Sequence, residues 1–147
     1  SADLSVLIES ADSGVHMAVS PDQFRVVCFQ GHPEYDINSL LKEYKRDVLL
    51  FLNDQGQRPP HPDNYFSEQA GAIADHYIYG ALRAKGAGKA IPPFPEDEIL
   101  PHIDNTWRDT GKSIFNNWLG LVYQLTNVER RLPFVEGVDP ANPLGLL

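Results

Sequence analysis

The stretch FRVVCFQGHPEYD, residues 24–36, joins a short apolar segment to a glycine, a histidine and a glutamate. Along a strand, residues 24–30 alternate between two faces, and both faces are mainly apolar. A strand that is apolar on both faces is typical of a sheet that helices cover on both sides. We therefore predict a layered α/β fold in which this strand, with Cys28, is buried.

The segments on either side of this stretch predict three strands followed by about three helices. Apolar runs bounded by turn residues predict strands at residues 4–8, 15–19 and 24–30. Apolar residues at helical spacing predict helices at residues 37–52, 67–85 and 112–125. Asp36 is the expected N-cap of the first helix. The proline-bearing segments 55–66, 89–106 and 133–147 are expected to be loops or an irregular tail.

Each expected helix has one apolar face that should point inward. In the first helix this face holds Ile37, Leu40, Leu41, Tyr44, Val48 and Phe51. In the second it holds Ala70, Ile73, Ala74, Tyr77, Ala81 and Leu82, and in the third Ile114, Phe115, Trp118, Leu119, Val122 and Leu125. Arg46 lies opposite the apolar face of the first helix.

The composition narrows the classes of function. The 147 residues predict a single domain, residues 1–147, and the net charge of −8 argues against binding nucleic acid or an anionic membrane. One cysteine excludes an internal disulfide, and His16, His61, His76 and His102 lack the spacing of metal ligands. Since there is neither a long apolar run nor a signal peptide, a cytoplasmic protein is expected. Ser1 is not an initiator methionine, which suggests a fragment or a processed chain.

His32 directly follows the end of the third expected strand and Gly31, a place where α/β proteins commonly bind ligands. An imidazole there suits a general base, and Glu34 is near enough to orient it and to stabilise its protonated form. From the residues alone, a capping or surface histidine is the commoner explanation of such a pattern. A catalytic histidine is the alternative.

The segment Gly31–Asp36, together with Glu43-Tyr44 and Arg46-Asp47, resembles the signature of the homoserine O-succinyltransferases and O-acetyltransferases. These enzymes are a branch of the class I glutamine amidotransferase-like superfamily. Further resemblance lies at Val6–Ser10, Gly14–His16, Asn64–Phe66, Trp107-Arg108 and Phe115–Thr126. Residues 67–104 are longer than this family leads us to expect, and Thr110 stands where a Ser-His pair is expected.

The resemblance implies the C-terminal part of a flavodoxin-like layered domain and a role in methionine biosynthesis. Such an enzyme transfers a succinyl or acetyl group from acyl-CoA to the hydroxyl of homoserine through a Cys-His-Glu triad. It implies that His32 is the general base, that Glu34 orients it, and that Arg46 grips the carboxylate of the amino acid. It also implies a homodimer, no cofactor beyond acyl-CoA as co-substrate, and a cysteine that lies in a missing N-terminal half. The chain alone is therefore expected to be inactive.

Cys28 is a poor candidate for that cysteine, because four residues of strand separate it from His32 by about 13 Å. Two other functions remain open from the sequence. One is a glutamine amidotransferase-type hydrolase that uses the same His-Glu pair, and the other is a non-catalytic fragment or paralogue. The choice between succinyl and acetyl donors also stays open.

Overall fold

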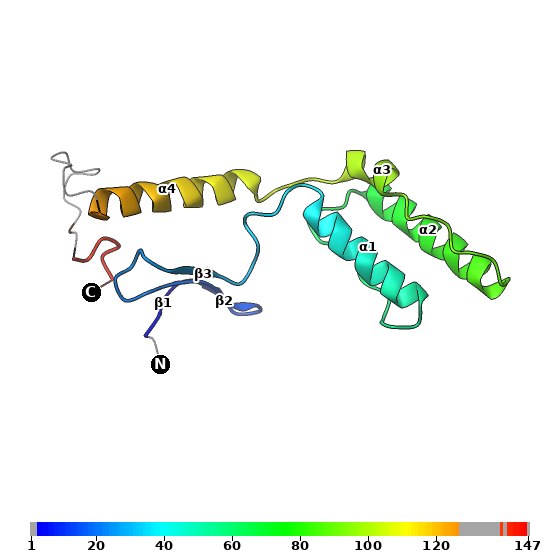
Figure 1. The fold of residues 1–147 in the computed structure, drawn as a ribbon, viewed down its shortest axis with the longest axis horizontal. Coiled ribbons are helices and arrows are strands. Elements are labelled where there is room, and N and C mark those ends of the chain that lie inside the picture. The colour runs from blue at the N-terminus through cyan, green and yellow to red at the C-terminus, as the bar shows by residue number, and fades with distance from the viewer. Residues whose placement is uncertain (1–2, 127–138, 140, 147) are drawn as a thin grey trace. The chain divides into compact units, whose positions relative to one another are not determined.

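The computed structural model describes residues 3–126, 139 and 141–146 (Figure 1). These residues form an α/β structure with a three-stranded antiparallel sheet and four α-helices among the described residues, as the predicted class requires. The chain divides into two compact units, and each is described separately. Unit 1 takes in Ser1–Glu34 and Asp109–Leu147, and unit 2 is Tyr35–Arg108.

The sheet belongs to unit 1 and confirms the three expected strands. Its strands are β1 (Ser5–Ser10), β2 (Gly14–Val19) and β3 (Val27–Phe29), in the order β1-β2-β3. The turn between β1 and β2 ends at Gly14, whose φ of 73° suits a residue without a side chain. β1 and β3 are therefore the two edges of the described sheet.

β3 is shorter than expected, and the prediction that both of its faces are covered was wrong for this chain. Cys28 is exposed, and Val26 is 52% exposed. The faces are uncovered because β3 is an edge of the described sheet. The strand is short because the Asp22 carboxylate accepts hydrogen bonds from the backbone N–H groups of Phe24 (3.3 Å) and Arg25 (3.1 Å). These bonds bend residues 22–25 into a loop, so only three residues remain to pair with β2.

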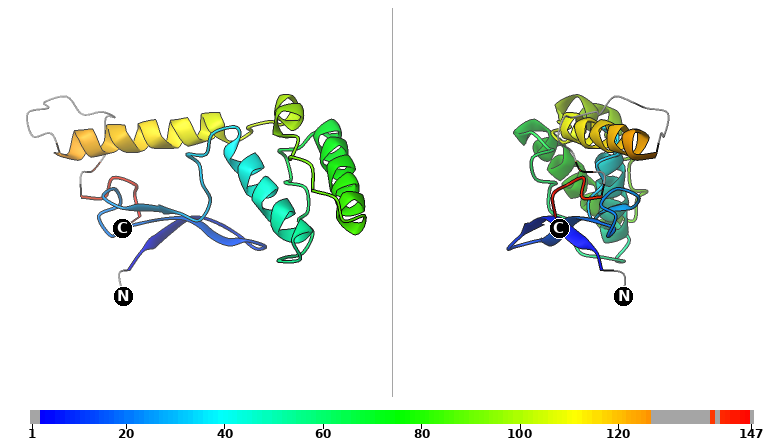
Figure 2. Two further views of the ribbon diagram at one scale, coloured as in Figure 1. Left: turned by 45° about the vertical axis from the view of Figure 1, so that its right-hand side comes forward. Right: turned by 90° about the vertical axis from the view of Figure 1, so that its left-hand side faces the viewer.

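The helix α4 (Arg108–Thr126) also belongs mainly to unit 1 and runs along one side of the sheet (Figure 2). The indole N–H of Trp118 donates a hydrogen bond of 2.6 Å to the Phe24 carbonyl. No residue of α4 is fully buried, and Phe115 and Leu119 are 57% and 49% exposed. The prediction that these two residues point inward was therefore wrong, because nothing among the described residues covers their side of the helix.

Unit 2 has a core of its own, built around two helices that run in the same direction (Figures 1 and 2). α1 is Ser39–Leu52 and α2 is Glu68–Gly86. Near their C-terminal ends, the Lys85 ammonium donates to the Leu52 carbonyl at 2.7 Å. Near their N-terminal ends, the Tyr65 hydroxyl donates to the Ile37 carbonyl and accepts from the Leu41 N–H at 3.1 Å.

The expected apolar faces of α1 and α2 are largely confirmed. The buried residues of the two helices are Leu41, Tyr44, Val48 and Leu52 on α1, and Ala70, Gly71, Ala74, Tyr77, Ile78 and Ala81 on α2. Ile37 and Leu82, which were also expected to point inward, are 46% and 42% exposed. Ile37 precedes the first turn of α1, so the helical spacing that placed it on the buried face does not apply to it.

The ends of the helices differ from the expectation at two places. Asp36 is not the N-cap of α1; it precedes a turn in which its carbonyl accepts from the Ser39 N–H at 3.0 Å, and Asn38 takes the cap position. The expected loop 89–106 contains the short helix α3 (Glu96–Ile99) and the 3-10 turn η1 (Leu100–His102). Proline is tolerated in a first helical turn, and three acidic residues in the first turn of α3 suit its N-terminus. Prolines in this segment therefore stand at the starts of α3 and η1 as well as in loops.

In the part of the chain that the structure describes, no helix is both long and apolar enough to cross a lipid bilayer. Of the expected irregular tail, residues 133–147, the structure describes 139 and 141–146, and the rest lies outside the described residues. Within it, the Leu144 N–H donates to the Gln23 side chain at 2.7 Å, and the Gln23 amide donates to Asn142 at 2.8 Å. These bonds tie residues 142–144 to the loop before β3.

Candidate catalytic pair and basic groove

The turn after β3 is built closely around Gly31. The Gln30 N–H donates to the His16 carbonyl on β2 at 2.9 Å, which continues the pairing of the two strands for one more residue. A Cβ atom on Gly31 would lie 3.0 Å from Cε1 of the His16 ring, closer than nearly all real contacts of this kind. Glycine therefore allows the chain to pass His16 and to present His32 immediately afterwards.

His32 and Glu34 form the pair that the sequence predicts. Nδ1 of His32 lies 2.8 Å from Oε1 of Glu34, within hydrogen-bond distance. When Nδ1 carries the proton and donates to the carboxylate, Nε2 holds the lone pair that a general base needs. The hydrogen bond from His32 is the main reason why the pKa of Glu34 lies below its ordinary value, and a bond from the Glu34 backbone N–H adds to it.

Both side chains of this pair are exposed, at 57% for His32 and 68% for Glu34. Exposed ion pairs contribute little to the stability of a fold, because water screens the charges and the side chains lose freedom. Stability is therefore a poor explanation for the pairing. The geometry fits a base and its orienting carboxylate, and it also permits the alternative of a paired surface histidine.

Arg46 lies in unit 2, on the exposed side of α1, as the sequence predicts. Its Nε lies 2.8 Å from Oδ1 of Asp47, and this contact is the main reason why the pKa of Arg46 is raised. Because Nε faces Asp47, the two terminal nitrogens of the guanidinium remain for another acceptor. A planar fork of this kind suits a carboxylate.

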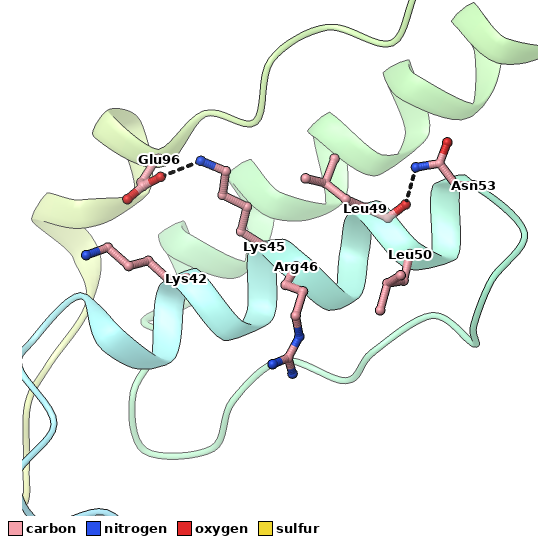
Figure 3. A pocket seen from close by; sticks show the side chains of 7 residues that line it. All are labelled: Lys42, Lys45, Arg46, Leu49, Leu50, Asn53 and Glu96. Carbon is pink, nitrogen blue, oxygen red and sulfur yellow. Dashed lines mark hydrogen bonds and ion pairs between the residues drawn. The ribbon is translucent and has the colours of Figure 1, made fainter.

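Arg46 lines an open groove along α1, with a volume of about 520 Å³ (Figure 3). The lining residues are Lys42, Lys45, Arg46, Leu49, Leu50, Asn53 and Glu96. Lys45 pairs with Glu96 of α3 at 2.7 Å, whereas the guanidinium of Arg46 points away from that pair (Figure 3). The groove thus offers an excess of positive charge in a chain whose net charge is −8.

The structure contains a second histidine–carboxylate pair that the sequence analysis missed. Nε2 of His61 lies 2.8 Å from Oδ1 of Asp75, and Arg58 pairs with the same oxygen at 2.6 Å. The His61 ring packs against Gly71 so closely that a Cβ there would lie 3.0 Å away. The pair ties the loop before α2 to that helix. The two residues are 14 positions apart, and no local sequence pattern predicts a contact at that separation.

In residues 3–126, 139 and 141–146, no group of three or more His, Cys, Asp or Glu side chains is placed to hold a metal ion. Cys28 stands exposed on β3, where its thiol is open to solvent in this chain. Among the described side chains, the His32 imidazole can accept a proton and the Arg46 guanidinium can bind an anion.

Comparison with known proteins assigns the family. A family model described as homoserine O-succinyltransferase matches residues 1–128. The chain is 56% identical over 146 residues to a homoserine O-succinyltransferase of Methylococcus capsulatus, covering 99% of this chain and 41% of that protein. It is 57% identical over 144 residues to the protein of that name from Methylobacter tundripaludum, covering 97% of this chain and 41% of the relative. A third, from Thiothrix nivea, is 54% identical over 144 residues, or 97% of this chain and 40% of the relative.

No solved structure matches the chain. The chain spans about two fifths of the length of the curated relatives, whereas those relatives match nearly all of the chain. The family match includes all of unit 2, unit 1 up to residue 128, and therefore the His32–Glu34 pair and Arg46. On these matches, the chain belongs to the homoserine O-succinyltransferase family.

Proposed function

We propose that the chain is the C-terminal part of a homoserine O-acyltransferase, and that the full-length enzyme moves an acyl group from acyl-CoA to the hydroxyl of homoserine. The observation that carries the proposal is the 2.8 Å contact between His32 and Glu34 in a chain of this family. The names of the relatives favour succinyl-CoA as the donor over acetyl-CoA.

In this proposal the chain supplies the base, and the rest of the enzyme supplies a cysteine nucleophile. The thiolate attacks the acyl-CoA thioester, which releases CoA and leaves the acyl group on the cysteine. Nε2 of His32 then takes the proton of the homoserine hydroxyl while the oxygen attacks the acyl carbon, and the cysteine leaves as a thiolate. Glu34 holds the imidazole in the required tautomer and stabilises the imidazolium.

Arg46 has the role of binding the α-carboxylate of homoserine. Its exposure of 63% and its contact with Asp47 support this role, because the terminal nitrogens are presented while the guanidinium plane is held from one side. Arg46 stands on a regular helix, which positions a side chain more closely than a loop does.

The same proposal gives the chain a place in a larger fold. We place the sheet and helices described above in the C-terminal part of one glutamine amidotransferase-like catalytic domain. The preceding part of the domain would add further strands and the cysteine. A cytoplasmic homodimer without a cofactor, with acyl-CoA only as co-substrate, completes the proposal.

The decisive experiment measures CoA release by the full-length enzyme with homoserine and either succinyl-CoA or acetyl-CoA. The substitution His32→Ala is expected to lower kcat by about 10²–10⁴-fold, the usual contribution of a positioned general base. The matched control is His76→Ala, since His76 is an exposed histidine on α2. Full turnover in His32→Ala would remove His32 from the mechanism, and release of ammonia from glutamine in place of CoA would favour the amidotransferase alternative.

A further inference from the structure

Contacts of the backbone help to hold the turn that carries His32 and Glu34. Both side chains are more than half exposed, so the backbone on either side of Glu34 matters for their positions. Backbone contacts flank Glu34 at Pro33 on one side and at Tyr35 on the other. We infer that Trp107 and Gly111, which make these contacts, are positioning residues for the His32–Glu34 pair, an inference that rests on the proposed function.

In unit 2, the residue after Glu34 is tied down by three hydrogen bonds. The Tyr35 carbonyl accepts from the indole N–H of Trp107 at 3.1 Å and, at the longer distance of 3.5 Å, from the Asn105 amide. The Tyr35 hydroxyl donates to the Glu43 carboxylate of α1 at 2.7 Å. Both ends of Tyr35 are therefore held, one residue beyond the carboxylate that orients His32.

Trp107 is itself fixed by the core of unit 2. Its ring lies 5.8 Å from the ring of Tyr65, centre to centre, and Tyr65 is 1% exposed. The Tyr65 hydroxyl bonds to the backbone at the N-terminal end of α1. The indole N–H that holds the Tyr35 carbonyl is thus anchored to the buried core of the unit.

In unit 1, the residue before Glu34 rests against the first turn of α4. A Cβ atom on Gly111 would lie 2.6 Å from the Pro33 carbonyl oxygen and 3.4 Å from the Pro33 Cβ. Real Cβ atoms do not approach a backbone oxygen so closely, so only glycine fits without a shift of the turn. Glycine weakens a helix, which makes its presence at this contact informative.

The two contacts come from one short segment of the chain. Residues 107 and 111 each contact a neighbour of Glu34, and each does so within its own unit. Catalysis depends on geometry to a fraction of an ångström, and a misplacement of about 1 Å costs on the order of 10²-fold in rate. Segment 107–111 is therefore expected to set the rate without touching the substrate.

The test compares four variants of the full-length enzyme. Trp107→Phe keeps the aromatic ring and loses the N–H, and Gly111→Ala adds the Cβ that meets Pro33. The matched controls are Trp118→Phe, which loses an indole hydrogen bond to Phe24, and Gly80→Ala, where a Cβ meets nothing within 4 Å. For each variant, kcat, both KM values and the pH profile of kcat are measured, and rates are divided by the fraction of enzyme that forms an acyl adduct.

The expected result is a fall in kcat of about 10-fold or more for Trp107→Phe and Gly111→Ala, with both KM values within about twofold of wild type. The pH profile of kcat should shift in these two variants and in neither control. Unchanged kcat and pH profile would overturn the inference, and so would a loss explained entirely by less folded enzyme. If His32→Ala kept full turnover, the proposed role of His32 as the base would fail instead, so the two failures are distinguishable.

Discussion

Three tyrosines in the core of unit 2 differ in the number of hydrogen bonds that their hydroxyl groups make. Among the described residues, the buried Tyr44 hydroxyl has no partner. The Tyr77 hydroxyl donates one bond, to the Pro92 carbonyl at 3.0 Å. The Tyr65 hydroxyl makes two, to the backbone at Ile37 and Leu41. Replacing each tyrosine with phenylalanine therefore removes none, one or two hydrogen bonds from the same core.

The loss of unfolding free energy is expected to grow with the number of hydrogen bonds that the substitution removes. Tyr65→Phe should cost about 1–3 kcal/mol, because Leu41 is fully buried and water cannot replace the lost partner of its N–H. Tyr77→Phe should cost about 1 kcal/mol, the usual net value of one hydrogen bond. Tyr44→Phe should be neutral or stabilising, because it removes a buried polar group that has no partner.

The pH dependence of the unfolding free energy gives a second test of Tyr44. Burial raises the pKa of Tyr44 from 10.0 to about 12, with a smaller contribution from the Asp75 charge. A raised pKa means that the protonated tyrosine favours folding below pH 10 and that this contribution is lost as the pH rises toward 12. At pH 11 the wild type should already have lost about 1.4 kcal/mol, one pKa unit's worth, which Tyr44→Phe does not lose.

The assay is equilibrium urea denaturation of the full-length enzyme, followed by tryptophan fluorescence, to which Trp107 contributes from a position 5.8 Å from the Tyr65 ring. Free energies at pH 8 rank the three variants. At pH 11 the difference between the wild type and Tyr44→Phe isolates Tyr44, because the raised pKa values of Tyr65 and Tyr77 are common to both proteins. A cost for Tyr44→Phe as large as that for Tyr65→Phe would refute the reasoning, because hydroxyl bonding would then not decide the ranking.

Three further predictions concern the site. Cys28→Ala should keep both acyl transfer and the acyl adduct in the full-length enzyme, and loss of the adduct by mass spectrometry would make Cys28 the nucleophile. His32→Ala should bring the pKa of Glu34 back up toward 4.5, since the His32 hydrogen bond is the main cause of its lowering; a carboxyl NMR titration that stays low would contradict this. Arg46→Lys should raise KM for homoserine about tenfold or more, as losing ~1.4 kcal/mol does, while Lys42→Gln in the same groove should not.

Local sequence patterns predicted unit 2 well where the pattern itself determines the structure. Helical spacing identified the buried faces of α1 and α2, because both faces pack against partners within the unit. Ser67 begins α2 as a regular cap, its hydroxyl accepting from the Ala70 N–H at 3.2 Å. The pairing of His32 with Glu34 was also predictable, since only Pro33 separates them and proline limits the turn.

What sequence patterns missed depends on contacts between distant residues. The hydrogen bond from Trp107 to the Tyr35 carbonyl joins residues 72 positions apart, and the pairing of His61 with Asp75 joins residues 14 positions apart. Neither follows a helical or strand period, so neither has a local signal. The resemblance marked Trp107 as a family position without saying what its side chain does.

The exposed apolar surface of unit 1 leads to the last prediction. Its exposed apolar side chains on the strands and on α4 are Val6, Ile8, Val15, Phe115, Leu119 and Tyr123, each at least 41% exposed. The sequence identified apolar faces correctly there, but the surface that would cover them is not among the described residues. Soluble proteins rarely leave such faces open, and the curated relatives are more than twice as long as this chain.

We therefore expect the preceding part of the full-length enzyme to cover β1 and α4. Backbone amides of β1 and α4 should exchange hydrogen more slowly in the full-length enzyme than in the isolated 147-residue chain. Amides of α2 are the internal control, because α2 already packs into the core of unit 2 and should differ little between the two proteins. Equal exchange of α4 in both proteins would mean that its apolar side stays open in the whole enzyme. The faces would then have to be explained by contact with a second copy, which a dependence of the exchange on protein concentration would reveal.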